Sequence, residues 1–352
     1  MGDTAEEIMK AAIISFTWDW LGGGERYSAT LARFLEIKGY DTEIWWPKDI
    51  KSQIKERFDI DLRSTKFVDY NPYNQDFIAR VKKTREYDLI FWVSDGSIPT
   101  SLAKKTIIHF QIPFHNAKSS SLQNKFKARF YTCVSNSFFT KSFVDKTYSV
   151  NSEVIYPPVD IGAVKPGKKE NIILSLARLS QTLHAKRQDV LIEAFSRLRL
   201  PDWKLVLAGG SSDPSYLSHL RQIAQSLPID IIPNLPLNQA RQLLSKSKIF
   251  WSATGYGVNP KLFPEKVEHF GITPIEAMAA GCVPVVTKAG GHLETVTEGE
   301  TGFLWETIDQ LNQKTAGLAK DQKLWEKLSQ AAVNRSKQFS TTVFESKFSR
   351  VI

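Results

Sequence analysis

The stretch from Glu265 to Gly291 constrains the fold of this chain more than any other, because it combines a loop, a capped helix and a strand. After the loop EHFGIT, the residue pattern predicts a short helix from Pro274 to Ala280. Thr273 is a suitable N-cap, proline suits the first helical position, and Gly281 suits the left-handed position that ends a helix. The apolar run from Val283 to Val286 then predicts a buried strand.

The beginning of this helix predicts an anion site. Unpaired main-chain N–H groups and the positive end of the helix dipole converge near Gly271 to Ile275, which suits a phosphate group. Two carboxylates border the same place, Glu268 on the loop and Glu276 in the predicted first turn. Ionised glutamates only accept hydrogen bonds, so sugar or ribose hydroxyl groups are their natural partners beside a diphosphate. Two glutamates at this spacing are otherwise ordinary surface charges, but in this setting they indicate sugar-nucleotide recognition.

Length and composition indicate a globular chain without a membrane span. The 352 residues suffice for two domains, and 42% hydrophobic with 24% charged residues is a soluble profile. Cys133 and Cys282 lie in apolar surroundings without metal-ligand spacing, which predicts buried thiols in a reducing cytosol. Residues 1–10 lack the basic start and apolar core of a signal peptide, so we expect a frayed leader and a cytoplasmic protein.

The net charge of +9 favours anionic partners over plain solubility. No recognised nucleic-acid motif or basic-aromatic repeat occurs, so we expect no nucleic acid and consider acidic substrates or an anionic membrane surface instead. The predicted helix at 119–129 has a basic-amphipathic pattern, which suits either an ordinary surface helix or one that rests peripherally on a bilayer. Its apolar residues are Leu122, Phe126 and Phe130, and its cations are Lys118, Lys125, Lys127 and Arg129.

Strands alternate with helical segments through the whole chain, which predicts an α/β protein with two doubly wound parallel sheets. The first half opens with an apolar strand at 11–16, a glycine-rich turn and a helix that ends at Gly39. Pro, Gly and Lys concentrate around 157–170, which indicates a linker, and the second half restarts with a strand from Ile172 to Leu176. We expect domains at 1–160 and 161–335, followed by a C-terminal helix at 336–352.

Two glycine-rich turns follow predicted strands. Gly23 and Gly24 let the backbone approach a ligand closely, although the turn does not match G-x-G-x-x-G and Glu25 is an awkward neighbour for a pyrophosphate. Gly209, after the strand at 203–208, begins a second turn that permits phosphate binding.

Three further side chains suit a phosphate or sugar site. Arg178 and Lys186 flank a strand–helix connection, where arginine supplies a fork for phosphate and lysine a mobile charge. His109 ends a predicted strand, where open α/β sheets place ligand-binding residues, although a lone histidine is more often structural.

The central stretch EHFGITPIEAMAAGCVPVV, followed by GGHLETV and GETGFL, resembles the nucleotide-sugar site of retaining GT-B glycosyltransferases of family four. VSNSFFTKSF and YPPVD are similar to family segments that lead to the hinge. The resemblance implies two Rossmann-like domains facing a cleft. The first would bind the acceptor, the second would bind the donor, and the terminal helix would cross back to the first.

The resemblance also implies roles for the candidate residues. His109 would contact the sugar near its reacting carbon, Glu268 its hydroxyl groups, and Arg178 and Lys186 the diphosphate, although the intervening loop is longer than usual in the family. The residues expected to line the nucleotide-sugar site are Gly23, Gly24, Gly209, Phe270, Gly271, Ile272, Thr273 and, at the ribose, Glu276. We identify no Asp-x-Asp motif of the GT-A type, and therefore expect no required metal and no cofactor besides the donor substrate.

The predicted function is retaining transfer of a hexose to a lipid-linked or glycan acceptor. The sequence of the central stretch resembles that of mannosyltransferases that use GDP-mannose, while UDP-linked donors also occur in the family. A UDP-sugar 2-epimerase of the same fold is an alternative, but the GGGE turn does not resemble the start of that family. A catalytically silent sugar-nucleotide-binding protein is another, opposed by the complete set of donor-site residues. A nicotinamide dehydrogenase lacks both G-x-G-x-x-G and a ribose-binding acid.

Overall fold

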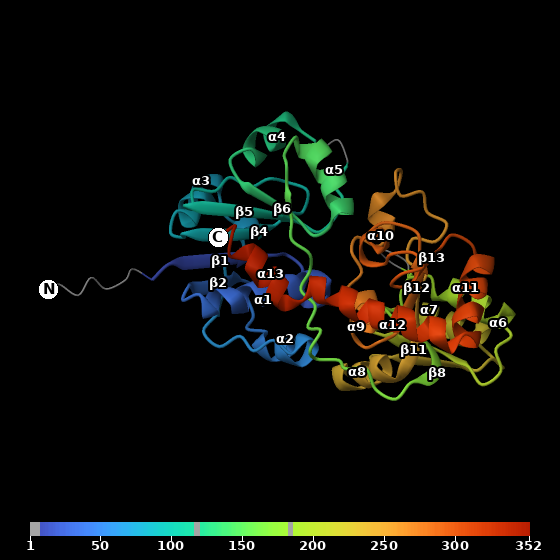
Figure 1. Ribbon diagram of the computed structural model, residues 1–352. Helices are drawn as coiled ribbons and strands as arrows, with labels where there is room; N and C mark the ends of the chain where they lie inside the picture. The colour runs from blue at the N-terminus through green and yellow to red at the C-terminus, as the bar shows by residue number, and fades with distance from the viewer. Residues whose placement is uncertain (1–7, 116–119, 182–185) are drawn as a thin grey trace. The chain divides into compact units, whose positions relative to one another are not determined.

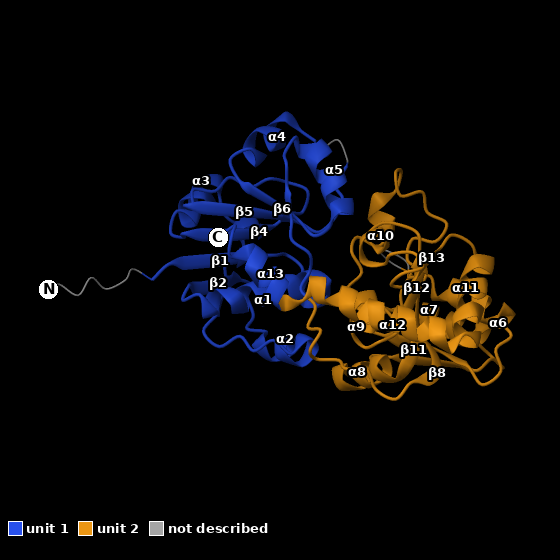
Figure 2. Ribbon diagram, viewed as in Figure 1, with its two compact units in different colours: residues 1–158, 342–352 blue, residues 159–341 orange. Residues whose placement is uncertain are grey.

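Two parallel sheets, one in each of two units of the chain, form the framework of the computed structural model (Figures 1 and 2). Unit 1 comprises Met1–Pro158 and Thr342–Ile352, and unit 2 comprises Val159–Thr341. The structure describes residues 8–115, 120–181 and 186–352. The first seven residues of the predicted leader, the cation Lys118 and the loop at 182–185 therefore lie outside the described residues.

The sheet of unit 1 has seven parallel strands in the order β3-β2-β1-β4-β5-β6-β7. Its central strands are apolar on both faces, as a parallel sheet covered on both sides requires. Ala11 and Ile13 pack into one core and Ala12 and Ile14 into the other, because successive side chains of a strand point to opposite faces. The strands are β1 (Lys10–Ile14), β2 (Asp41–Trp45), β3 (Lys66–Val68), β4 (Leu89–Val93), β5 (Lys105–Phe110), β6 (Thr132–Ser135) and β7 (Glu153–Val154).

The helices of unit 1 cover this sheet, and the last helix of the chain joins them. Phe344 and Phe348 are buried against Tyr27 and Phe91, so the C-terminus packs into the same core as the first strand. The helices are η1 (Trp18–Trp20), α1 (Gly23–Ile37), α2 (Lys51–Phe58), η2 (Pro72–Asn74), α3 (Phe77–Thr84), α4 (Leu122–Ala128), α5 (Phe138–Tyr148) and α13 (Thr341–Phe348).

The sheet of unit 2 has six parallel strands in the order β10-β9-β8-β11-β12-β13. Its two cores show the same alternation, with Ile173 on one face and Ile172 and Leu174 on the other. The strands are β8 (Glu170–Leu176), β9 (Lys204–Gly209), β10 (Ile229–Pro233), β11 (Ser247–Ser252), β12 (Val283–Thr287) and β13 (Phe303–Trp305). The helices are α6 (Gln188–Arg197), α7 (Pro214–Ile223), α8 (Leu237–Lys246), η3 (Pro264–Lys266), α9 (Ile272–Ala279), α10 (His292–Thr295), α11 (Ile308–Lys320), α12 (Gln322–Ser336) and η4 (Lys337–Phe339).

The strand order reverses at one point in each sheet, between β1 and β4 and between β8 and β11. Ligands of open α/β sheets bind outside the carboxyl ends of the strands at such a point. The prediction of two doubly wound parallel sheets is therefore confirmed, and the fold directs attention to the loops that follow these four strands.

Candidate functional site

The loop and helix predicted to form an anion site lie beyond the carboxyl end of β11, and the helix begins earlier than predicted. Gly271 has φ 99° and ψ 73° and is the N-cap, so α9 starts at Ile272. The prediction of Thr273 as N-cap is wrong, because the left-handed glycine turns the chain into the helix two residues earlier. Glu276 is consequently the fifth helical residue rather than part of the first turn. Gly281, with φ 77°, ends the helix as predicted.

Main-chain contacts hold the loop before α9 against a glycine pair. Gly291 N–H donates to the carbonyl oxygen of Glu268 at 2.7 Å. A Cβ atom on Gly290 would lie 2.1 Å from that oxygen, and a Cβ atom on Gly291 would lie 2.3 Å from Cα of Phe270. Neither position tolerates a side chain without moving the backbone, so this close packing fixes the loop and the place of Glu268.

Glu268 forms an ion pair with Lys186, whose Nζ donates to Oε2 at 2.8 Å. Both side chains are mostly buried, with 20% and 19% exposed. Burial raises the pKa of Glu268, but the charge of Lys186, the nearby His292 and the hydrogen bond from Lys186 together outweigh it and lower the pKa to about 2. Glu268 is therefore an ionised acceptor at neutral pH, and the structure brings together a carboxylate and a cation from loops that follow β11 and β8.

His292 is a third member of this cluster, which sequence reasoning missed. It begins α10 and has no exposed surface. Its Nδ1 lies 3.0 Å from both the main-chain oxygen and Oγ1 of Thr287. Burial lowers the pKa of His292 to about 4, although Glu268 opposes the shift. A polar side chain directly after the Gly-Gly pair was the available signal.

The remaining predicted residues around α9 contribute main chain more than side chain. The Phe270 ring is buried against Phe339, with ring centroids 5.6 Å apart, and belongs to the core of unit 2. Ile272 and Thr273 are half-buried in the first helical turn. Glu276 is also half-buried, so its carboxylate is not sealed inside the core.

Two predicted residues lie at the ends of β8 and β9. Gly209 has φ 149°, and a Cβ atom there would lie 2.1 Å from the carbonyl oxygen of Ala177. The glycine is thus needed for the close approach of these strand ends, in addition to any ligand role. Arg178 has an exposed side chain, and its carbonyl oxygen accepts a hydrogen bond from Nε2 of Gln188 at 3.0 Å. The loop that begins at Arg178 is therefore fixed at its first residues.

His109 lies inside the sheet of unit 1 rather than beyond its end. It pairs with Val93 on β4 and Val134 on β6, and one further residue of β5 follows it. Its ring is fully buried and stacks on Tyr27, with centroids 4.0 Å apart, and on Phe91. Burial lowers its pKa to about 3. In this position His109 has no exposed surface, and its predicted contact with a sugar stays a prediction.

The glycine-rich turn of unit 1 starts α1. The Glu25 carboxylate accepts hydrogen bonds from Gly22 N–H at 2.8 Å and from the Thr17 hydroxyl at 2.5 Å, so Glu25 caps the helix. A Cβ atom on Gly24 would lie 2.0 Å from Oε1 of Gln111, the first residue after β5. Gln111 therefore occupies the place directly beyond the end of β5, beside the glycine-rich turn.

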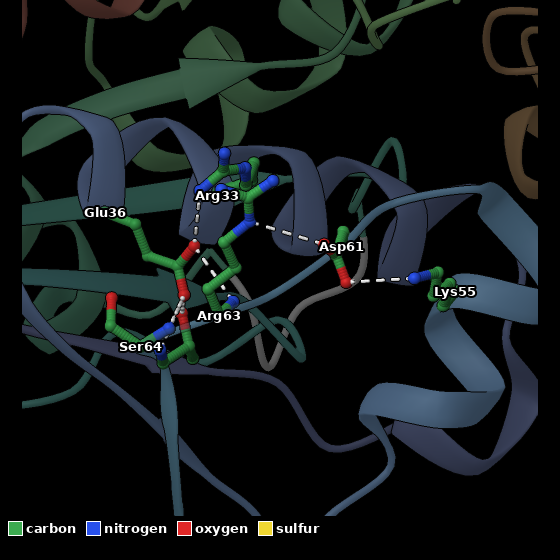
Figure 3. Close-up of polar contacts among 7 residues, drawn as sticks. Arg33, Glu36, Lys55, Asp61, Arg63 and Ser64 are labelled. Carbon is green, nitrogen blue, oxygen red and sulfur yellow. Dashed lines mark hydrogen bonds and ion pairs between the residues drawn. The ribbon is translucent and has the colours of Figure 1, made fainter.

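No group of three or more His, Cys, Asp or Glu side chains is placed to hold a metal ion within residues 8–115, 120–181 and 186–352. One Asp-x-Asp triplet does occur, Asp59-Ile60-Asp61, and the sequence reasoning overlooked it. Figure 3 shows Asp61 between Lys55 and Arg63, each at 3.4 Å. Both cations form ion pairs with the Asp61 carboxylate on the surface after α2, so the triplet has a local structural role.

Within the described residues, no helix combines the length and the apolar character that a membrane span requires.

A family model described as "Glycosyl transferases group 1" matches residues 160–335, half of the chain and nearly all of unit 2. The chain is 27% identical over 228 residues to the Dictyostelium discoideum GDP-Man:Man(3)GlcNAc(2)-PP-Dol alpha-1,2-mannosyltransferase, covering 59% of this chain and 43% of that protein. It is 29% identical over 202 residues to the Candida glabrata alpha-1,3/1,6-mannosyltransferase ALG2, covering 46% and 43%. The match spans less than half the length of these relatives.

Among solved structures, a glycosyltransferase from Rickettsia africae superimposes with a TM-score of 0.76 at 20% identity, covering 98% of each chain. At this identity the likeness concerns the fold, and it confirms the predicted GT-B fold.

Proposed function

We propose that this chain, which belongs to the glycosyl transferases group 1 family, transfers mannose from a nucleotide diphosphate mannose to a lipid-linked glycan. The name of the Dictyostelium relative gives GDP-Man as donor and Man(3)GlcNAc(2)-PP-Dol as acceptor, and the Candida relative is also named a mannosyltransferase. GDP-mannose is therefore the first donor to test, with UDP-linked hexoses as the alternative.

The observation that carries this proposal is the ion pair between Lys186 and Glu268. The two residues follow β8 and β11, the neighbouring strands at which the order of the sheet reverses, where ligands of such sheets bind. Ionised Glu268 suits the hydroxyl groups of a sugar, and the ammonium group of Lys186 suits a diphosphate. Gly271 and the start of α9 add main-chain N–H groups and a positive dipole end beside the same carboxylate.

The chemistry follows from this arrangement. The bond between the anomeric carbon and the diphosphate oxygen breaks, the diphosphate keeps the electron pair, and an acceptor hydroxyl forms the new bond as it loses its proton. Lys186, Arg178 and the start of α9 would stabilise the charge that develops on the leaving group. Glu276 would bind the ribose. We include independence from metal in the proposal, because three protein groups can neutralise the leaving diphosphate. Retention of configuration enters the proposal only through the family resemblance.

A binding protein without transfer activity is the second candidate, and one observation favours it. His109, the residue expected to touch the sugar, is enclosed by Tyr27 and Phe91 in the core of unit 1. A donor site without a group from unit 1 could hold a sugar nucleotide and leave it intact. Binding and transfer must therefore be measured separately.

The first experiment is a thermal-shift panel with GDP, UDP, ADP, GDP-mannose and UDP-glucose. A ligand that binds only the folded protein stabilises it, by about 2.7 kcal/mol at a hundred times Kd. We expect stabilisation by one nucleotide, reduced in Glu276→Ala and kept in the control Glu306→Ala, whose exposed carboxylate pairs with Lys288. No shift with any nucleotide would overturn the donor site.

Transfer is tested next, with the labelled sugar nucleotide that gave a shift and a lipid-linked glycan as acceptor. Labelled lipid product from the wild type, and none from Glu268→Gln, would support the transferase. Stabilisation by a sugar nucleotide without product from any of several lipid-linked acceptors would favour the binding protein instead.

We also propose that unit 1 rests peripherally on an anionic bilayer at the cytoplasmic face. Three large apolar side chains of α4 and the turn after it are exposed, Leu122 by 85%, Phe126 by 63% and Phe130 by 70%. Lys125, Lys127 and Arg129 flank them, and residues 120–130 contain no acid. Apolar side chains between cations on one helix suit insertion among anionic lipids.

A second helix extends this surface. α3 exposes Phe77 and Ile78 and also carries cations without acids. The charge of Arg80 on α3 contributes, after burial, to lowering the pKa of Lys127 on α4, so the two helices lie near each other. A basic surface of this extent adds electrostatic attraction to the apolar contacts.

Vesicle co-sedimentation tests the membrane surface. We expect binding to vesicles with phosphatidylserine and weak binding to pure phosphatidylcholine. Phe126→Ser should reduce it, whereas Ile37→Ser, which changes a similarly exposed residue (61%) on α1, should leave it unchanged. Equal losses in both variants, or no binding to anionic vesicles, would overturn this proposal without touching the donor site.

A further inference from the structure

His292 occupies a buried position directly behind the loop that carries Glu268. The preceding residue, Gly291, donates its N–H to the main-chain oxygen of Glu268. Both side chains also border Gly271, where a Cβ atom would lie 3.4 Å from Cδ2 of His292 and 3.5 Å from Cγ of Glu268. The ring edge that contains Cδ2 and the adjoining Nε2 is therefore turned towards the loop of the donor site.

The hydrogen bonds of Nδ1 decide which nitrogen of His292 carries the proton. Nδ1 lies 3.0 Å from the carbonyl oxygen of Thr287, which can only accept. It also lies 3.0 Å from the Thr287 hydroxyl, which donates its own proton to the carbonyl oxygen of Thr254. Both contacts require a proton on Nδ1, so the neutral ring has its lone pair on Nε2.

Nε2 of His292 is buried and has no hydrogen-bond partner among the described residues. A buried acceptor without a partner costs about 1–3 kcal/mol, so it calls for an explanation. Glu268, whose charge acts on His292, is also a hydrogen-bond acceptor and cannot donate to Nε2. Lys186 is the cation that pairs with the Glu268 carboxylate. The cluster thus contains two acceptors and one mobile cation.

Building on the proposed function, we propose that His292 is a positioning residue for Glu268, which takes up one proton at Nε2 when a bound diphosphate attracts Lys186 away from the carboxylate. The proton comes from solvent, and no bond other than N–H forms. The resulting imidazolium replaces the ammonium group as the cationic neighbour of Glu268. The carboxylate then keeps its charge and orientation while it binds a sugar hydroxyl.

The electrostatics of the cluster give this coupling its sign. Burial lowers the pKa of His292, Glu268 raises it, and Lys186 lowers it. Removal of the Lys186 charge leaves the attraction of Glu268 unopposed, so the pKa of His292 must rise. The charged and titratable groups on the elements around His292 are Lys186, Glu268, His269, Lys288, Glu294 and Arg335.

The coupling can be tested without any ligand, by nitrogen-15 NMR of histidine-labelled protein. The His292 signals are assigned by their loss in His292→Gln. We expect an unprotonated Nε2 at neutral pH in the wild type, and a pKa higher by roughly one pH unit in Lys186→Met. His109 is the internal control, because it is equally buried and its pKa does not depend on Lys186. An unchanged His292 pKa in Lys186→Met would overturn the proposal.

Calorimetry then tests the ligand step. GDP and UDP are titrated at about pH 5 in buffers of different ionisation enthalpy, which gives the number of protons taken up on binding. We expect the wild type to take up more protons than His292→Gln, by roughly 0.4, because a pKa that rises from about 4 by roughly one unit leaves His292 half protonated at pH 5, whereas glutamine cannot be protonated. Equal uptake in both proteins would overturn the role of His292 alone. Failure of both nucleotides to bind the wild type would overturn the proposed function, and with it the event that displaces Lys186.

Discussion

The two buried histidines occupy related places in the two sheets, yet their surroundings differ. His109 lies on β5 and His292 follows β12, and each of these strands is the second one after the reversal of strand order in its sheet. Both rings are fully buried, and burial lowers both pKa values, to about 3 and about 4. His109 stacks against two aromatic rings, Tyr27 and Phe91, whereas His292 lies behind an ionised carboxylate. A low pKa therefore reports burial in both units, and only the charged neighbour indicates a site.

Two glycines, one in each unit, also differ in what an added side chain would meet. A Cβ atom on Gly24 of unit 1 would meet the end of the Gln111 side chain, which can swing aside. A Cβ atom on Gly291 of unit 2 would meet the main chain of Phe270 and His269, which cannot. The loop that carries Glu268 is therefore held by backbone packing, whereas the turn at Gly24 meets a side chain.

The largest effect should come from this pair of glycines. Gly291 has φ −64°, so alanine fits its conformation and any cost comes from the overlap with Phe270. We expect Gly291→Ala to reduce the free energy of unfolding by about 4 kcal/mol and Gly24→Ala by less than about 1 kcal/mol. Urea unfolding of both variants measures the difference. Similar losses at the two positions would mean that the two loops are held alike.

The carboxylates of Glu36 in unit 1 and Glu268 in unit 2 provide a second comparison between the two units. Glu36 of unit 1 accepts hydrogen bonds from the main chain of Arg63, Ser64 and Thr65 and from Arg33, so it ties the loop after α2 to α1 (Figure 3). Burial opposes ionisation of this carboxylate, but these bonds outweigh it and lower its pKa.

We expect different phenotypes from the two carboxylates. Glu268→Gln should reduce transfer about 100-fold, equal to about 3 kcal/mol, and should also lower stability, because it leaves the mostly buried Lys186 without its ion-pair partner. Glu36→Gln should lose about 2 kcal/mol of stability and keep its transfer rate. Initial rates and urea unfolding of both variants give the result. A Glu268→Gln enzyme with normal rates would remove the central residue of the proposed site.

The sequence predicted unit 2 better than unit 1 for a physical reason. The sheets, the end of α9 at Gly281 and the two glutamates all follow from local patterns of apolar residues, glycine and charge. The start of α9 was predicted too late, because Gly271 adopts a left-handed conformation that no side-chain cap announces.

Other features depend on which distant segments meet, and local patterns do not carry that information. His292 belongs to the site because Gly291 packs under Phe270, a contact between separate segments. His109 is enclosed because Tyr27 of α1 and Phe348 of α13 cover that face of the sheet.

Acid should destabilise both units through their histidines. Unfolded histidine has a pKa near 6.5, so as pH falls below 6.5 the unfolded state takes up the proton first and stability is lost, until the folded pKa near 3 or 4 is reached. We expect each residue to cost about 2 kcal/mol at pH 5 relative to pH 7. Glu268 contributes outside this pH window, because its stabilisation is lost only as pH falls from about 4.5 towards 2.

Urea unfolding at pH 7, 6 and 5 should show a weaker pH dependence of stability in His109→Phe and in His292→Gln than in the wild type. Unaltered dependence would mean that these rings are protonated in the folded protein.

The smallest expected effect is the one that tests the comparison most directly. His109→Phe keeps an aromatic ring beside Tyr27 and Phe91 in the core of unit 1. We expect sugar-nucleotide binding and transfer within about twofold of the wild type, because nothing of His109 is exposed to a ligand. Kinetics at several donor concentrations, with thermal unfolding as the control for folding, measure this. A fall in kcat of more than about tenfold at unchanged stability and KM would mean that the histidine reaches the reacting sugar in the working enzyme. The ring would then have to leave its aromatic stack during each reaction cycle, and unit 1 would contribute to catalysis as the family resemblance implied.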